Sequence, residues 1–89
     1  MKSRTTARFR QSLRSLPPHV RRQAISAYRL FVSDPYHPSL HFKRVHATRL
    51  VYSARISRDY RVLGLREDET MLWFWIGTHA DYDKLLTQL

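Results

Sequence analysis

Residues 60–86 read YRVLGLREDETMLWFWIGTHADYDKLL, and this stretch decides the fold of the chain. Its first part, Tyr60–Arg66, has a short strand pattern that runs into the acidic turn Glu67–Glu69. A second strand, Thr70–Gly77, follows and contains MLWFWI, a run that is apolar at every position. Continuous apolar runs are typical of strands buried on both faces, so this strand is expected near the centre of a sheet.

The end of this strand brings polar side chains to the rim of the sheet. Gly77 allows the chain to turn sharply, and His79 and Tyr82 follow at once. Imidazole titrates near neutrality and can act as a general acid or base. Arg61 lies one strand away, and a guanidinium binds phosphate oxygens in a bidentate manner. The combination predicts an acid/base site for a phosphate substrate.

The rest of the chain places helices before strands. Phe9, Leu13 and Leu16 share one helical face. Asp34–Pro38 ends a longer helix, because its two prolines remove backbone donors. The predicted elements are an edge strand in residues 3–8, helices over Ala7–Leu16 and His19–Ser33, strands over Leu40–His46, Val51–Ser57, Tyr60–Arg66 and Thr70–Gly77, and a final helix over Ala80–Leu89.

This order predicts an α+β fold in which two N-terminal helices pack on one face of a mainly antiparallel sheet, with a short C-terminal helix. The 89 residues have room for one core, so residues 1–89 are expected to form a single domain. The chain has no cysteine, which suits a reducing cytoplasm. No apolar run approaches the roughly 20 residues that span a bilayer, so no membrane partner is expected.

The hairpin between the second and third strands has a register that the sequence defines. A three-residue loop, residues 57–59, places Ala54 opposite Val62 and gives a coherent apolar face. Arg55 then lies opposite Arg61 on the other face, where two like charges repel each other unless an anion binds between them.

The next hairpin extends this arrangement. A three-residue turn at Glu67–Glu69 places Arg61 beside Trp75 and Leu63 beside Trp73. Both indoles then share a face with the arginines and can stack unpaired bases. The alternative is that the C-terminal helix buries the tryptophans and the arginines only stack on them.

The charge of the chain is unevenly placed. The net charge is +9, and Met1–Arg66 holds fifteen basic residues against two acidic ones, whereas Glu67–Leu89 holds one against five. Such a field favours a polyanion such as nucleic acid. Lys43 and Arg44 on the first predicted strand, and Arg58 in the hairpin loop, are the candidate backbone contacts; a solvated face is the alternative for the first two.

A metal site is not expected. Pro38 prevents His37 and His41 from sharing a helical face, and few acids lie near them or near His46. No other cofactor motif is present, so the predicted chemistry uses side chains alone.

The segments YSARISRDYRV, residues 52–62, and IGTHADYD, residues 76–83, resemble the RelE/ParE superfamily of bacterial toxins, and its RelE-like ribosome-dependent mRNA interferases in particular. The resemblance covers nearly the whole chain. It implies a compact α+β toxin whose partners are a small cognate antitoxin, the ribosome and mRNA. It implies a chain that is a monomer when free.

The resemblance also implies roles for four residues, taken position by position. Arg61 matches an arginine that contacts the scissile phosphate, and Arg55 matches a second basic residue on the preceding strand. His79 matches the position proposed as general acid, and Tyr82 approximates an aromatic near the C-terminal end. The chain departs from the pattern in a short or missing N-terminal strand and in having Ser53 and Arg55 where some members have a lysine pair.

Three functions fit these features. The first is a toxin of a type II toxin–antitoxin system that cleaves mRNA on the ribosome. The second is a ParE-like inhibitor that binds a topoisomerase without doing chemistry, for which a titrating group at His79 has no use. The third is an inactive homologue that binds only RNA or an antitoxin. His79 also has a structural alternative as a helix cap, and Tyr82 as a packing residue.

Overall fold

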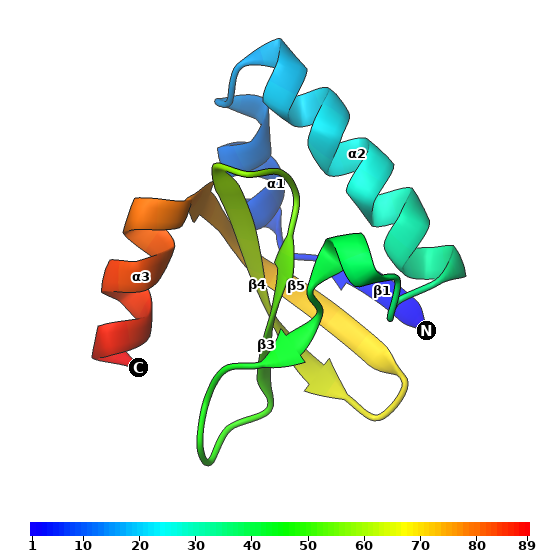
Figure 1. Cartoon of the computed structure of the whole chain (residues 1–89), viewed down its shortest axis with the longest axis vertical. Coiled ribbons are helices and arrows are strands. Elements are labelled where there is room, and N and C mark those ends of the chain that lie inside the picture. Colours follow the sequence, from blue (N-terminus) through cyan, green and yellow to red (C-terminus); the bar gives the residue numbers. More distant parts are fainter.

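The computed structural model describes residues 1–89 and contains five strands and three α-helices. The strands form one sheet in the order β1-β5-β4-β3-β2, in which β1 runs parallel to β5 and all other neighbours are antiparallel (Figure 1). The elements are β1 (Lys2–Thr5), α1 (Ala7–Arg14), α2 (Pro18–Ser33), a 3₁₀ turn (Pro38–Leu40), β2 (Lys43–Arg44), β3 (Val51–Arg55), β4 (Tyr60–Glu67), β5 (Thr70–Thr78) and α3 (His79–Gln88).

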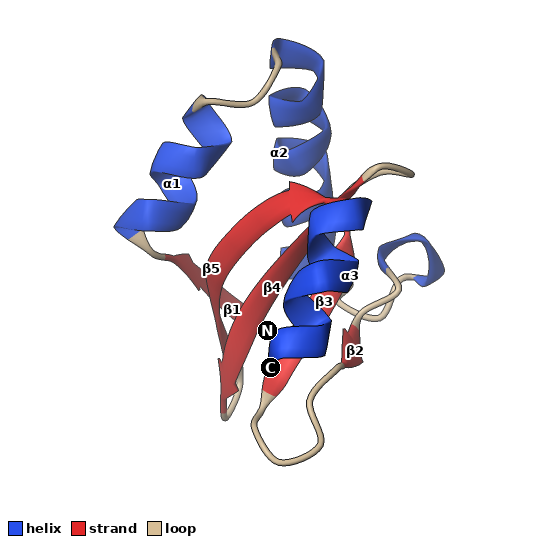
Figure 2. Cartoon of the chain, turned by 90° about the vertical axis from the view of Figure 1, so that its left-hand side faces the viewer, coloured by secondary structure: helices blue, strands red, loops and turns tan.

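Helices cover both faces of the sheet, as Figure 2 shows from the side on which α3 lies. The α1–α2 pair packs on one face, and α3 runs back across the other face over β4 and β5. The predicted α+β class, with two N-terminal helices and a short C-terminal helix, is therefore confirmed. The strand near the N-terminus is present as the parallel edge strand β1, although it ends at Thr5.

Local signals place the helix ends where the sequence predicted them within a few residues. The Thr6 Oγ1 atom accepts a hydrogen bond from the Phe9 backbone N–H (3.0 Å) and caps α1. Pro18 begins α2 at a position where its missing N–H costs nothing. The helix α3 begins at His79, one residue earlier than predicted, because Thr78 is its N-cap residue.

Two clusters of apolar side chains hold the layers together. The larger one lies between the sheet and the α1–α2 pair, and the smaller one lies under α3 around the fully buried Leu63. The buried members of the larger cluster are Phe9, Ala24, Phe31, Leu40, Ala54, Val62, Met71, Trp73 and Ile76. Since both faces are buried, β4 and β5 need apolar residues at successive positions, which explains the MLWFWI run.

The register of the β3–β4 hairpin is confirmed. Ala54 pairs with Val62, and Arg55 lies opposite Arg61. The backbone N–H of Ile56 donates to the Tyr60 carbonyl oxygen (3.1 Å), which closes the loop.

The predicted register of the β4–β5 hairpin is wrong. The turn has two residues instead of three, because Glu67 pairs with Thr70 and Asp68 adopts a left-handed φ of 55° that an aspartate tolerates. The register then shifts between Leu63 and Gly64, where an extra residue enters β5. As a result Arg61 lies opposite Gly77, and Leu63 lies opposite Trp75.

The predicted strand over Leu40–His46 is also too long. A 3₁₀ turn precedes it, and His41 has a left-handed φ of 45°, so only Lys43 and Arg44 pair with β3. None of the helices has the length and apolar character required to cross a membrane.

Candidate active site at the rim of the sheet

Three strand ends and the start of α3 meet at one rim of the sheet. Arg55 at the end of β3 lies opposite Arg61 at the start of β4, and Arg61 lies opposite Gly77 at the end of β5. Residues that face each other in an antiparallel pair have Cα atoms about 4.5–5.5 Å apart. The backbone N–H of His79 donates to the Asp59 carbonyl oxygen (2.7 Å), which ties the start of α3 to the hairpin loop. The rim therefore brings together three of the four predicted catalytic residues.

One nitrogen of Arg61 holds the hairpin loop. Its Nη1 atom donates to the carbonyl oxygens of Ser57 (2.7 Å), Tyr60 (3.0 Å) and Arg58 (3.3 Å). These neutral acceptors fix the guanidinium without cancelling its charge. The ion pairs of the molecule involve neither Arg61 nor Arg55. Two uncompensated positive charges on adjacent strands make this rim suited to an anion.

His79 lies beside this pair with its imidazole in contact with solvent. Its Nε2 atom is 3.5 Å from Asp83 Oδ1 one helical turn later, and 51% of the side chain is exposed. The helix cap is instead Thr78, whose Oγ1 accepts a hydrogen bond from the Asp81 N–H (3.1 Å). The predicted exposed rim position is thus confirmed, and the helix-cap alternative for the imidazole is not what the structure shows.

Tyr82 lies apart from the rim. It is 6% exposed, and its hydroxyl donates to Ser53 Oγ (2.9 Å) inside the cluster under α3. Its ring centroid is 6.1 Å from that of His79. This position suits the packing alternative, with the hydroxyl satisfying a buried serine.

The two tryptophans lie on opposite faces of the sheet, so the prediction that both share the face of the arginines is wrong. The extra residue in β5 separates them, and Trp73 is buried under α1 and α2 with its Nε1–H donated to Ser3 Oγ (2.8 Å). Trp75 remains on the face of Leu63 and packs in the cluster under α3, where its ring covers Gly77. Neither indole projects freely as a stacking platform.

The other residues predicted to contact RNA are Arg58, Lys43 and Arg44, and they lie in different environments. Arg58 is exposed in the hairpin loop next to Arg61. Lys43 lies opposite Ser53 on β3, so it lies on the α3 side of the sheet. Arg44 lies on the other face, where its Nε donates to the carbonyl oxygens of His46 (3.0 Å) and Arg49 (3.3 Å) and shapes the β2–β3 loop.

The far end of β4 carries a second arginine with defined partners. Arg66 Nη1 donates to the Tyr36 hydroxyl (3.2 Å), and this hydrogen bond raises the pKa of Arg66 above its ordinary value. The guanidinium also lies over the Tyr52 ring, 5.3 Å from the centroid. Four residues separate it from Arg61 along the strand, so it belongs to a different part of the surface.

Two of the histidines outside the rim, His37 and His46, bond to the backbone of their own loops. The Nδ1 atom of His37 accepts from the Ser39 N–H (3.2 Å), and that of His46 accepts from the Arg49 N–H (2.9 Å). No three His, Cys, Asp or Glu side chains gather in a way that could hold a metal ion.

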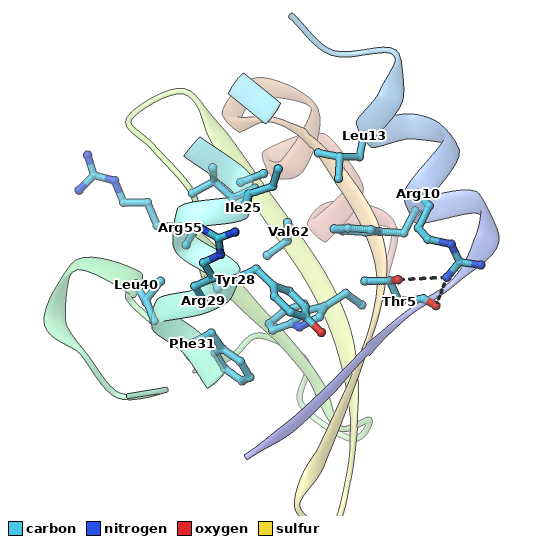
Figure 3. A pocket seen from close by; sticks show the side chains of 16 residues that line it. Thr5, Arg10, Leu13, Ile25, Tyr28, Arg29, Phe31, Leu40, Arg55 and Val62 are labelled. Carbon is cyan, nitrogen blue, oxygen red and sulfur yellow. Dashed lines mark hydrogen bonds between the residues drawn. The ribbon is translucent and has the colours of Figure 1, made fainter. Parts of the chain in front are cut away.

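An apolar groove between the α1–α2 pair and the sheet was not foreseen from the sequence (Figure 3). It encloses about 420 Å³, and aliphatic and aromatic side chains form most of its wall. Ile25 and Tyr28 line its α2 side and are 46% and 38% exposed, and Arg10, Arg29 and Arg55 flank it. A helix that packs on one side only needs a single apolar stripe. Apolar residues of α2 outside such a stripe were therefore the sequence signal that could have indicated the groove.

Comparisons with known proteins agree with this architecture. Residues 18–84 match the family model described as the ParE-like toxin domain. The chain belongs to the family of ParE-like toxin domains, and the predicted membership of the RelE/ParE superfamily is confirmed. No curated protein matches the sequence.

Solved structures of toxins share the fold at low sequence identity. A chain of the archaeal RelE–RelB complex of Pyrococcus horikoshii OT3 is 18% identical, with a TM-score of 0.70 over 86% of this chain and 92% of that one. A chain of the toxin–antitoxin complex RelBE2 of Mycobacterium tuberculosis is 22% identical, with a TM-score of 0.70 over 88% and 96%. The isolated RelE toxin of E. coli is 16% identical, with a TM-score of 0.65 over 99% and 98%.

Proposed function

We propose that this chain is the toxin of a type II toxin–antitoxin pair and that it cleaves mRNA on the ribosome. The observation that carries the proposal is the uncompensated Arg55–Arg61 pair on a hairpin to which the backbone of the exposed His79 is hydrogen-bonded. The ParE-like family and the structural similarity to RelE toxins support a toxin role. The RNA-cleaving activity rests on the chemistry of the rim.

The rim has the groups that RNA cleavage through the 2′-hydroxyl requires. The 2′-hydroxyl loses its proton to solvent water as its oxygen attacks phosphorus, the bond to the 5′-oxygen breaks, and negative charge builds up on the non-bridging phosphate oxygens. Arg61 and Arg55 would stabilise that charge from adjacent strands. His79 would donate a proton to the leaving 5′-oxygen, and Asp83 would keep the ring oriented. Burial of the Tyr82 hydroxyl gives that residue a supporting role in the fold.

A ParE-like inhibitor that binds a topoisomerase is the second candidate, because the matching family model is that of the ParE-like toxin domain. Such an inhibitor needs a binding surface but no titrating group at the rim. The two functions therefore differ in their dependence on His79 and in the process they stop, which is translation or DNA supercoiling.

The partner that neutralises the toxin would lie in the apolar groove. Arg10, Arg29 and Arg55 flank the groove, so an amphipathic segment with acidic edges is the complementary partner. A product of the neighbouring reading frame with this pattern is the expected antitoxin. The substitution Ile25→Glu should prevent rescue by that antitoxin without reducing toxicity, because Ile25 lines the groove and is not one of the residues that would take part in cleavage. Loss of toxicity together with rescue would instead place both functions on one surface.

Expression of the wild-type chain in bacteria tests the proposed activity. Growth should stop, and mapping of mRNA 5′ ends should reveal new ends that carry a 5′-hydroxyl, as cleavage through the 2′-oxygen requires. Intact mRNA together with relaxed or broken DNA would favour the topoisomerase inhibitor.

A further inference from the structure

An open cleft, lined by both polar and apolar residues, lies between α2 and the end of β3, next to the candidate active site. It has a volume of about 690 Å³, within the range of roughly 300–1,000 Å³ that ligand sites occupy. Its charged lining is wholly basic and consists of Arg22, Arg55 and, when protonated, His19. The other lining residues are Gln23, Ser26, Ala27, Leu30, Ser39, Leu40, Ile56 and Ser57, none of which is acidic.

The cleft is continuous with the rim through two shared residues. Arg55 lines the cleft and also faces Arg61 across the hairpin. Ser57 lines the cleft, and its carbonyl oxygen accepts the 2.7 Å hydrogen bond from Arg61. A strand of nucleic acid that places one phosphate at Arg61 can therefore continue past Arg55 toward Arg22 on α2.

The chemistry of the lining indicates what the cleft binds. Hydroxyl and amide groups of Ser26, Ser39 and Gln23 can donate hydrogen bonds to phosphate and ribose oxygens. The only aromatic ring in the lining is the His19 imidazole, so the cleft lacks the Phe, Tyr or Trp side chains that usually stack bases. The lining suits the sugar-phosphate backbone and carries no sequence preference.

We propose that this cleft binds the backbone of single-stranded RNA next to the phosphate held at the rim. The inference rests on the proposed RNA-cleaving function and adds a second contact surface, on α2, to it. Substitution of Arg22 tests the cleft independently of the rim, because Arg22 is exposed on α2 and lies outside the rim. Arg22 is a positioning residue for the RNA strand and takes no part in the chemical step.

The test uses a labelled RNA octamer with 2′-O-methyl riboses, which cannot be cleaved through the 2′-oxygen. Fluorescence anisotropy gives its affinity for the full chain at several salt concentrations. Each lost phosphate contact on single strands should reduce the slope of log K against log salt by about 0.7. Arg22→Gln should therefore weaken binding several-fold at low salt and reduce the slope by about that amount. Arg8→Gln removes the same charge from an exposed position on α1 and serves as the matched control.

The outcomes are distinct. Equal effects of Arg22→Gln and Arg8→Gln would overturn the proposal, because only overall charge would then matter. A glutamate octamer that binds as tightly as the RNA, with the same dependence on Arg22, would show an acidic-protein site instead. Cleavage of ribosome-bound mRNA is measured in parallel: Arg22→Gln should raise KM and leave kcat unchanged. If the wild type cleaves nothing while RNA binding still depends on Arg22, the proposed cleavage function is wrong and the proposal that the cleft binds RNA is supported.

Discussion

Arg55 and Arg61 face each other across the β3–β4 hairpin without an acidic partner for either. Directly opposed like charges destabilise an antiparallel pair by a few tenths of a kcal/mol up to about 1 kcal/mol. Their arrangement costs stability and contributes no packing to the core, so function is the better explanation for it. An anion bound between the two guanidinium groups would relieve the repulsion.

The first prediction is that Arg61→Ala abolishes growth inhibition while the fold stays intact. The substitution removes the guanidinium and its hydrogen bonds to the loop carbonyls, but it leaves the buried clusters unchanged. Growth after induction and the circular dichroism spectrum are the measurements. Arg8→Ala on α1 controls for the loss of one positive charge. A folded Arg61→Ala variant that is still fully toxic would rule out the phosphate-binding role of Arg61.

The second prediction separates chemistry from helix capping at two adjacent residues. His79→Ala should reduce single-turnover cleavage by a factor of about 10²–10⁴ with little change in Tm, because the exposed His79–Asp83 pair stabilises the fold weakly. Thr78→Ala removes the cap and should cost about 1 kcal/mol, a fall of roughly 4–8 °C in Tm. Cleavage per folded molecule should change little in Thr78→Ala. The reverse pattern would make His79 structural.

The third prediction concerns Tyr82, whose hydroxyl donates to Ser53 inside the protein. Tyr82→Phe should cost about 1 kcal/mol because it leaves the serine hydroxyl without this partner. Urea denaturation measures that loss, and the cleavage rate of the folded variant should equal that of the wild type. A large fall in cleavage with unchanged stability would restore the catalytic role that the sequence suggested.

At the scale of elements, the β3–β4 hairpin was predictable because an apolar pattern and a short loop define its register. The β4–β5 hairpin was not, since both faces of β5 are buried and its sequence is apolar on both. A pattern without alternation carries no signal for a bulge. The error moved Trp73 to the wrong face and shifted the partner of Arg61 by two residues, but the arginine pair and His79 stayed at the same rim.

The fourth prediction tests the packing at this bulge. A Cβ atom at Gly64 would lie 2.7 Å from Trp73 Cε3 and 3.0 Å from the Leu72 carbonyl oxygen. Gly64→Ala should therefore destabilise the fold by about 1–3 kcal/mol through overpacking, which exceeds the gain of roughly 0.5–1 kcal/mol from reduced chain entropy. A lower urea midpoint with an unchanged m-value is the expected result. Equal or higher stability would mean that the two strands lie further apart there.

At the scale of the whole molecule, the basic charges before Glu67 are spread over several elements, and Arg22, Arg55 and Arg61 lie at the rim and the cleft. The sequence predicted this field because charge needs no knowledge of the fold. It did not predict the apolar groove or the cleft, because both arise from the packing of α2 on the sheet. The surfaces for RNA and for a protein partner depend on this packing, whereas the rim depends mostly on strand ends.

The fifth prediction follows from the net charge of +9. Binding to ribosomes or RNA should weaken steeply with salt, with a log–log slope of about −0.7 for each phosphate contacted on single strands. Titrations at several salt concentrations measure the slope. A slope near zero would indicate an apolar protein surface as the main target.

Cleavage of ribosome-bound mRNA by the purified chain is the most direct test of the proposed activity. Ribosomes are programmed with one defined mRNA, and the wild type and Arg61→Ala are compared under single-turnover conditions, with a topoisomerase supercoiling assay alongside. We expect the wild type to produce fragments with 5′-hydroxyl ends, Arg61→Ala to produce none, and supercoiling to continue in the presence of either protein. Intact mRNA together with blocked supercoiling by the wild type would contradict the proposed activity.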